Sequence, residues 1–412
     1  MGYRKRGLES KFLKMNETFK VIMVIGARQV GKSTMLRHLA EDSGRVCVSL
    51  DDADLRELAN RDPKLFFQMY QPPVLIEEVQ KAPALFAEIK EICDSHAERG
   101  LFWLTGSLSK KLQKQAGGAV AGSICILNLH SLSAKELAGQ AKGSRHGSVS
   151  EYTLAALTER SQALPKNNIL DVYSRIWEGG MPGTLGMDPD HRRAYWNSYM
   201  ETYLMRDAVD DNGITDTEGF RKFLRGCAAF NGHLLNYTDI SNAAGVSGTT
   251  AKEWIQVLQA MGIVYLLEPL SSDALKRTVK TPKLYFCDTG LCAHLASWTS
   301  RDTLLNGAAA ERYLENYVVA EMIRNAAYGE QNVQLHFYRD QNQKEIPLIA
   351  EVDGILHPFQ IKRSASPDQR AIKAFAVLKK LDREIGTGGI LCLAEKPLPV
   401  DEANNLIPVN LI

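Results

Sequence analysis

The sequence has almost no net charge and no long apolar run, and both absences limit what the chain can be. Lysine and arginine number 49 and aspartate and glutamate 48, so the formal net charge is +1. No overall field therefore attracts the chain to nucleic acid or to anionic lipid, and any basic surface must be local. No apolar segment is long enough to cross a bilayer, so we expect no membrane partner.

Cysteine is scarce and poorly spaced for a metal site. The seven cysteines are odd in number and scattered, and only Cys287 and Cys292 lie close together. No second cysteine or histidine pair completes a zinc pattern. The basic residues within positions 4–14 resemble the start of a signal peptide, but the apolar run that follows, 21–25, is too short for one. The sequence therefore predicts a cytoplasmic protein with reduced thiols.

What is present is an ordinary globular composition, with 45% hydrophobic and 24% charged residues. At 412 residues the chain is too long for one core, and roughly two to four domains are expected. Its first part alternates short apolar segments with helical patterns, which is typical of a parallel sheet with helices on both faces. The five predicted strands are 20–25, 46–50, 73–77, 101–105 and 124–129.

Residues 20–40, KVIMVIGARQVGKSTMLRHLA, contain the pattern G-x-x-x-x-G-K-S between a predicted strand and a predicted helix. Gly26 and Gly31 let the backbone turn its N–H groups inward around a phosphate, and the helix N-terminus directs its partial positive charge to the same place. Lys32 can reach the β- and γ-phosphates, and the Ser33 hydroxyl can ligate Mg²⁺. The predicted nucleotide-binding residues are Gly26, Ala27, Arg28, Gln29, Val30, Gly31, Lys32, Ser33 and Thr34.

Polar residues follow the third and fourth predicted strands. Glu77 and Glu78 come at the carboxyl end of a buried strand, so we expect them near the metal and the γ-phosphate. We assign Glu77 to Mg²⁺, through water, and Glu78 to polarising the attacking water; the alternative is a solvated pair at a strand end. Ser107 ends the fourth strand and could sense the γ-phosphate, although a plain strand-to-turn exit explains it almost as well.

Several segments resemble the AAA+ ATPase core of a bacterial and archaeal family that carries a C-terminal domain of unknown function. They are GARQVGKST, VLIEEVQKAPALFAEIK, FWLTGS and ILNLHSLSAKEL, and then EGGMP, YLMRDAV and TPKLYFCDTGLCAHL. The resemblance implies a sheet of strand order 5-1-4-3-2 and ATP rather than a dinucleotide. The family usually has Asp where this chain has Glu77. Glutamate is one methylene longer and still anionic, so we expect metal binding with slow hydrolysis.

The middle of the chain is predicted to be helical. A Gly/Ser-rich linker at 139–150 precedes helical patterns at 150–177 and 190–207, which GGMPGTLG at 179–186 separates. Arg206 lies in the YLMRDAV motif and could act as an arginine finger on the nucleotide of a neighbouring subunit, as AAA+ rings require. The alternative is a surface salt bridge, because an aspartate follows it on a polar helix.

Residues 217–286 have the pattern of a helix-turn-helix with a wing. We predict that Thr238 caps a short helix through Ala244 and that 247–261 form a second helix, followed by a strand at 263–268. The wing would be 271–280. The second helix offers polar side chains but a single lysine, so DNA contact and a packing or partner role both stay open.

The last segment has the layout of a restriction-endonuclease-like core: a loop at 297–307, a helix over 311–327, then strands at 335–339, 345–352 and 355–362. Such sites gather acids and a lysine around a divalent metal. Pro347 stands where an aspartate is expected and Gln360 where a glutamate is expected, which leaves Glu321 and Lys362. We predict that this module keeps the fold and lacks nuclease activity.

Together these patterns predict an α/β protein that binds ATP and Mg²⁺ and hydrolyses ATP. The alternative is a nucleotide-responsive DNA-binding or scaffold protein with negligible hydrolysis; either could form a homo-oligomer. The predicted domains are an AAA+ P-loop core at 1–140, a helical lid or linker at 141–210, a winged helix at 211–298 and a nuclease-like domain at 299–412.

Overall fold

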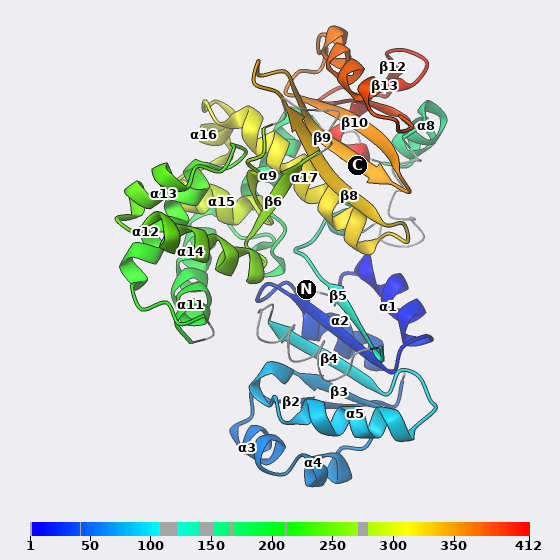
Figure 1. The fold of residues 1–412 in the computed structure, drawn as a ribbon, viewed down its shortest axis with the longest axis vertical. Helices are drawn as coiled ribbons and strands as arrows, with labels where there is room; N and C mark the ends of the chain where they lie inside the picture. Colours follow the sequence, from blue (N-terminus) through cyan, green and yellow to red (C-terminus); the bar gives the residue numbers. More distant parts are fainter. Residues whose placement is uncertain are drawn as a thin grey trace. The chain divides into compact units, whose positions relative to one another are not determined.

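The computed structural model describes residues 2–41, 43–107, 122–139, 152–164, 168–210, 212–270 and 279–412. Two units divide the chain (Figure 1): Met1–Lys142 with Ala260–Ile263, and Gly143–Gln259 with Val264–Ile412. Most of the predicted linker at 139–150 and of the predicted wing at 271–280 lies outside the described residues.

The first unit is built on a five-stranded sheet whose paired strands run parallel. Its order, β2-β3-β4-β1-β5, is the predicted order 5-1-4-3-2 read from the other edge. The predicted strands are confirmed to within two residues at each end, because each is a short, largely apolar run. β1, β3 and β4 are buried throughout, as parallel strands covered on both faces are, whereas β2 and β5 at the two edges of the sheet are partly exposed. The strands are β1 (Val21–Gly26), β2 (Val46–Ser49), β3 (Val74–Glu77), β4 (Phe102–Ser107) and β5 (Ile124–Asn128).

Helices connect these strands and bury apolar side chains against the sheet. Phe66, Phe86 and Ile89 pack with Val21 and Ile76 in one core cluster. The helices are α1 (Leu8–Asn16), α2 (Lys32–Ala40), α3 (Ala53–Arg61), α4 (Pro63–Met69), α5 (Leu85–Ser95), α7 (Ala134–Leu137) and the one-turn η1 (Val79–Lys81).

The second unit begins with helices, as predicted. The pattern at 150–177 gives two helices rather than one, since Asn168 caps a new helix by accepting from the N–H groups of Leu170 and Asp171. The elements are α8 (Leu154–Ala163), α9 (Ile169–Glu178), η3 (Pro182–Thr184), α10 (Pro189–Tyr199), the π-helical turn η4 (Met200–Leu204) and α11 (Met205–Asp210).

Three helices and two antiparallel strands follow: α12 (Thr217–Ala229), α13 (Tyr237–Ala244), α14 (Gly248–Ala260), β6 (Val264–Pro269) and β7 (Lys283–Phe286). The apolar faces of α12 and α14 are buried. The predicted cap of α13 was wrong. The N-cap is Asn236 rather than Thr238. Its side chain accepts from the N–H groups of Thr238 and Asp239, and an N-cap residue accepts from the residues two and three positions after it.

The C-terminal segment adds a long buried helix, α17 (Ala310–Tyr328), and most of an eight-stranded sheet of order β12-β13-β11-β10-β9-β8-β6-β7. The three predicted strands and the predicted helix are confirmed. The predicted loop at 297–307 contains α16 (Arg301–Leu305), which Ser300 caps. The elements not yet named are α15 (Thr289–Leu295), β8 (Val333–Arg339), β9 (Glu345–Val352), β10 (Ile355–Lys362), η6 (Gln369–Lys380), β11 (Gly388–Cys392), β12 (Leu398–Pro399), β13 (Asn404–Pro408) and η7 (Val409–Leu411).

The eight-stranded sheet crosses the predicted boundary at residue 298. Glu268 and Pro269 of β6 pair in parallel with His336 and Phe337 of β8. The hairpin assigned to a winged helix therefore shares its sheet with the C-terminal strands. Across the parts of the chain that the structure describes, no helix combines the length and the apolar character that crossing a membrane requires.

Candidate nucleotide site

The loop between β1 and α2 bends at its two glycines. Gly26 has φ +154°, and a Cβ there would lie 2.1 Å from the carbonyl oxygen of Leu129. Gly31 has φ +98° in the left-handed region and directly precedes α2. Both positions exclude a side chain, one by contact and one by backbone conformation, so the loop conformation depends on the spacing of these glycines.

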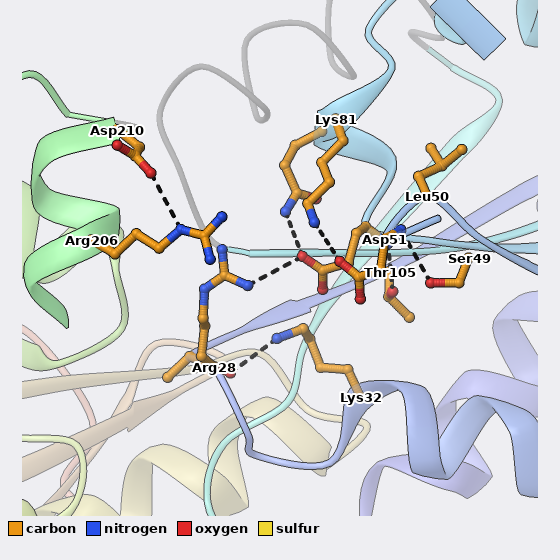
Figure 2. A network of polar contacts seen from close by, with 12 residues as sticks. Arg28, Lys32, Ser49, Leu50, Asp51, Lys81, Thr105, Arg206 and Asp210 are labelled. Carbon is orange, nitrogen blue, oxygen red and sulfur yellow. Dashed lines mark hydrogen bonds and ion pairs between the residues drawn. The ribbon is translucent and has the colours of Figure 1, made fainter. Parts of the chain in front are cut away.

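Lys32 is buried and its ammonium group turns back over the loop. Its Nζ donates to the carbonyl oxygens of Gly26, at 3.0 Å, and Ala27, at 2.9 Å (Figure 2). A phosphate bound in the loop would offer this ammonium group a charged acceptor in place of neutral ones. Ser33 lies half-buried in the first turn of α2, where its hydroxyl can serve a metal.

The backbone of Glu78 adopts a conformation that is unfavourable for residues other than glycine. Its φ of 58° and ψ of 42° are left-handed, and its N–H donates to Thr105 Oγ1 at 3.2 Å. The carboxylate accepts from Gln80 at 2.8 Å and lies 3.4 Å from the guanidinium of Arg28 in the loop. Strained residues of this kind cluster at functional sites. The contact with Arg28 places the Glu78 carboxylate beside the glycine loop.

Glu77 has a partner that the sequence reasoning missed. Its carboxylate is 4% exposed and accepts from Arg37 Nε at 2.7 Å and Nη2 at 2.5 Å. This pairing raises the pKa of Arg37. Arg37 lies one helical turn after Ser33 on α2, and that spacing was the signal in the sequence. The acid assigned to the metal is thus held by a cation of the protein.

Two buried polar atoms at the carboxyl ends of the strands have no acceptor or donor among the described residues: Ser107 Oγ and Gln80 Oε1. Ser107 lies in register with Gly26 at the end of the neighbouring strand. Buried polar groups normally find a partner. A phosphate oxygen or metal-bound water could supply one, so these atoms fit a nucleotide with Mg²⁺ at this edge of the sheet.

Arg6 holds the glycine loop in place through buried hydrogen bonds. The sequence analysis did not identify it. Its Nε pairs with Glu136 of α7 at 3.0 Å, its Nη1 donates to the carbonyl of Val30 at 2.7 Å, and its Nη2 donates to that of His130. The sequence showed Arg6 only as one of several basic residues near the N-terminus. Nothing local marked it as a buried anchor, because its partners lie 24 to 130 residues away.

The remaining predicted residues belong to the second unit. Arg206 is exposed on α11 and pairs with Asp210 at 3.3 Å, one turn along the helix (Figure 2). Glu321 is buried against Arg324 at 2.8 Å, and Gln360 Nε2 donates to the carbonyl of Glu345 at 2.9 Å. Lys362 lies 4.0 Å from Glu311. The ranges that the structure covers hold no group of three or more histidine, cysteine or acidic residues placed to bind a metal ion.

Three family models match separate parts of the chain. Residues 18–138 match a model described as AAA domain. Residues 169–302 match domain of unknown function DUF8612, and 310–412 match domain of unknown function DUF4143. The first match, the parallel sheet and the glycine loop define the N-terminal unit as a P-loop domain of the AAA type, a class of nucleotide-binding ATPases.

Two mycobacterial proteins are similar along nearly the whole chain. They are the uncharacterized proteins Rv2008c of Mycobacterium tuberculosis and Mb2031c of Mycobacterium bovis. Each is 24% identical over 396 residues, which is 95% of this chain and 80% of the relative.

Among solved structures, a Walker-type ATPase of Pyrococcus abyssi matches at 12% identity and a TM-score of 0.40, covering 71% of this chain and 96% of that one. The RuvB Holliday junction branch migration motor of Thermotoga maritima matches at 16% identity and a TM-score of 0.26, covering 66% and 90%. TM-scores this low do not establish a shared architecture.

Proposed function

We propose that this protein binds ATP with Mg²⁺ and hydrolyses it to ADP and phosphate. The observation that carries the proposal is the juxtaposition of Lys32, on a glycine loop at a helix N-terminus, with the strained Glu78, whose carboxylate lies 3.4 Å from Arg28 of the same loop. Phosphoryl transfer depends on positioning and on charge stabilisation, and this edge of the sheet supplies both.

Each predicted residue has a role in the proposal. Lys32 and the loop backbone hold the β- and γ-phosphates, and Ser33 and Glu77 serve the metal. When bound, Mg²⁺ would neutralise phosphate charge. Glu78 orients and polarises the attacking water, and the orphan hydroxyl of Ser107 contacts the γ-phosphate. Arg206 would complete the site of a neighbouring subunit in a homo-oligomer.

The test separates binding from turnover. Lys32→Ala should weaken the binding of a fluorescent ATP analogue at least tenfold, and Glu78→Gln should keep binding and lose most phosphate release. Lys64→Ala and Glu91→Gln change an exposed lysine and an exposed glutamate of the same unit and should match the unaltered protein. Unchanged affinity in Lys32→Ala would show that the site is misassigned, and unchanged turnover in Glu78→Gln would move the water-activating role elsewhere.

The second candidate is a nucleotide-responsive DNA-binding or scaffold protein with negligible hydrolysis. The pairing of Glu77 with Arg37 favours it, because a carboxylate held by a guanidinium is a poorer metal ligand. Phosphate release above background in the unaltered protein would exclude it. Retarded migration of duplex DNA that depends on added ATP, without phosphate release, would support its DNA branch.

DNA contact would use α14 of the proposed winged helix. Thr249, Lys252, Glu253 and Gln256 are exposed on this helix, and amide and hydroxyl side chains can contact base edges. The proposal predicts that Lys252→Ala reduces retardation of duplex DNA, whereas Lys222→Ala, an exposed change on α12, does not. Equal retardation by both variants would favour a packing or partner role for the helices.

For the C-terminal segment we propose a nuclease-like fold without nuclease activity. The charge of Glu321 is compensated by Arg324, and Gln360 is engaged in a bond to the backbone of β9. Plasmid DNA incubated with the protein and Mg²⁺ should remain uncut. Cleavage that Lys362→Ala abolishes would instead establish an active nuclease.

A further inference from the structure

The second unit contains a cavity of about 460 Å³ that the proposed ATPase does not use. It is lined by side chains of α9, α10, η4, α12 and α15 and by the segment that follows α15. Three of the five tryptophans of the chain, Trp177, Trp196 and Trp298, lie on its wall. The volume falls within the range of small-molecule sites, about 300 to 1,000 Å³.

Three buried N–H donors on this wall lack an acceptor among the described residues. They are Arg192 Nε, Trp196 Nε1 and Arg221 Nε. Arg192 and Trp196 are 4% and 2% exposed, so water has little access to them. The Trp177 indole, by contrast, donates to the carbonyl of Trp298 at 2.8 Å. A buried donor without an acceptor is unfavourable, and three around one cavity point to an acceptor supplied by a ligand.

The protein holds these donors firmly in place. Arg192 donates through Nη1 to the carbonyl of Glu178 at 3.1 Å and through Nη2 to that of Met187 at 3.0 Å. Both Nη atoms of Arg221 are engaged by Glu201, at 2.6 and 3.1 Å. The Nε–H of Arg192 is therefore a donor without an acceptor, and that of Arg221 makes no hydrogen bond but lies 3.8 Å from the carboxylate of Glu218. A site whose donors are positioned before the ligand arrives loses less entropy on binding.

The charge on the wall is positive. Four arginines line the cavity, at 192, 193, 221 and 225, against two carboxylates, Asp190 and Glu201. Both carboxylates are already paired, with Arg193 and Arg221. Two further acids lie near the arginines: Glu178 is 4.0 Å from Arg192, and Glu218 is 3.8 Å from Arg221. Arg225 is exposed and forms no ion pair within the described residues. His294 contributes no charge at neutral pH, because burial and the nearby Arg225 lower its pKa. The positive charge of Arg225 therefore favours an anion at this wall.

The aromatic rings restrict the shape of that anion. The guanidinium of Arg192 lies over the Trp177 ring at 5.2 Å from its centroid. The rings of Trp196 and His294 are stacked at 6.5 Å, with 28° between their planes. Flat faces of this kind accommodate a planar group beside the charged one.

We propose that this cavity binds a small organic anion, in which a carboxylate or phosphate is carried on a planar ring. The anionic oxygens accept from Arg192, Trp196 and Arg221, Arg225 adds charge at the mouth, and the ring lies against the indoles. The proposal is independent of the ATPase, since every residue in it belongs to the second unit.

The test uses the full chain carrying Lys32→Ala, so that phosphate probes are not taken up by the glycine loop. Benzoate, indole-3-acetate, AMP and inorganic phosphate are titrated separately and followed by calorimetry and tryptophan fluorescence. We expect saturable binding of at least one ring-bearing probe with a Kd below about 1 mM. Arg225→Met, a change at an exposed side chain, should weaken it about tenfold or more, and Arg61→Met, an exposed arginine of the first unit, should leave it unchanged.

A second variant addresses the orphan donor itself. Trp196→Phe removes the N–H and keeps an aromatic ring, so it should weaken binding while the protein stays folded by circular dichroism. Tighter binding of AMP than of both aryl carboxylates would assign the anion to phosphate, and the reverse order to carboxylate. Absence of saturable binding of all four probes, or binding that Arg225→Met leaves unchanged, would overturn the proposal, as would binding of inorganic phosphate alone.

Discussion

Arg37 holds both carboxylate oxygens of Glu77, at 2.7 and 2.5 Å. The two residues are 40 positions apart, one in the last turn of α2 and one at the end of β3. Glu77 is buried, while the Arg37 side chain is 59% exposed. The pair therefore lies at the surface of the proposed nucleotide site. The Arg37 guanidinium binds the carboxylate that would otherwise serve the metal. We therefore expect Arg37 to compete with Mg²⁺ for the carboxylate of Glu77.

Replacing Arg37 should release Glu77 and speed hydrolysis. We expect Arg37→Ala to raise Mg²⁺-dependent phosphate release by about threefold to tenfold, because a half-exposed ion pair is broken at modest cost. The rate is measured over a range of Mg²⁺ concentrations. Arg61→Ala removes an exposed arginine paired with Glu57 and serves as the control. If the rate of phosphate release falls in Arg37→Ala, Arg37 stabilises the site and does not compete with the metal.

Shortening Glu77 tests the same pairing from the other side. Glu77→Asp retracts the carboxylate by one methylene, so the two bonds to Arg37 cannot both persist while the charge is kept. We expect half-maximal hydrolysis at a lower Mg²⁺ concentration in Glu77→Asp and at a higher one in Glu77→Ala, which lacks the carboxylate. If the aspartate variant needs more Mg²⁺ than the natural protein, the added reach of glutamate is itself required.

A buried charge cluster in the second unit should dominate its stability. Lys283, 3% exposed, pairs with Glu315 at 2.8 Å and with Glu345, and Tyr285 also donates to Glu315. Lys283→Met leaves the partly buried carboxylate of Glu315 without its cation, whereas Glu345 keeps Arg339 at 3.0 Å. The expected loss in the free energy of unfolding is about 3 kcal/mol. The measurement is the midpoint of denaturant unfolding, with the exposed Lys344→Met as control. A loss below about 1 kcal/mol, the value of a surface pair, would mean that solvent reaches the cluster.

Acidic pH should destabilise the second unit through its histidines. Burial lowers the pKa of His233, His294, His336 and His357. Between the unfolded pKa, about 6.5, and the lowered folded values, the unfolded chain binds more protons, so stability is complete above pH 6.5 and falls as the pH drops. Melting temperatures at pH 7.5 and 5.5 measure the effect. His357→Gln should reduce this difference, and His96→Gln, at an exposed position, should not. A melting temperature independent of pH over this range would contradict it.

The sequence determined the local parts of this protein. The spacing of Gly26, Gly31, Lys32 and Ser33 specified the phosphate loop, because backbone freedom and helix initiation depend on neighbours in the chain. Apolar runs specified the five strands of the first unit, and periodicity specified the buried faces of α12 and α14. The local departures were small: the cap of α13 lies two residues earlier than predicted, at Asn236, and the short helix α16 lies within a predicted loop.

Only the tertiary structure decided which distant groups meet. Arg37 reaches Glu77, Arg6 reaches Glu136, and β6 joins the sheet of β8 across a boundary that composition had suggested. The cavity of the second unit combines side chains of separate helices, and no single segment of the sequence indicates it. The physical reason is that periodicity reports which side of an element is buried, whereas partners across 40 to 130 residues depend on how the elements pack.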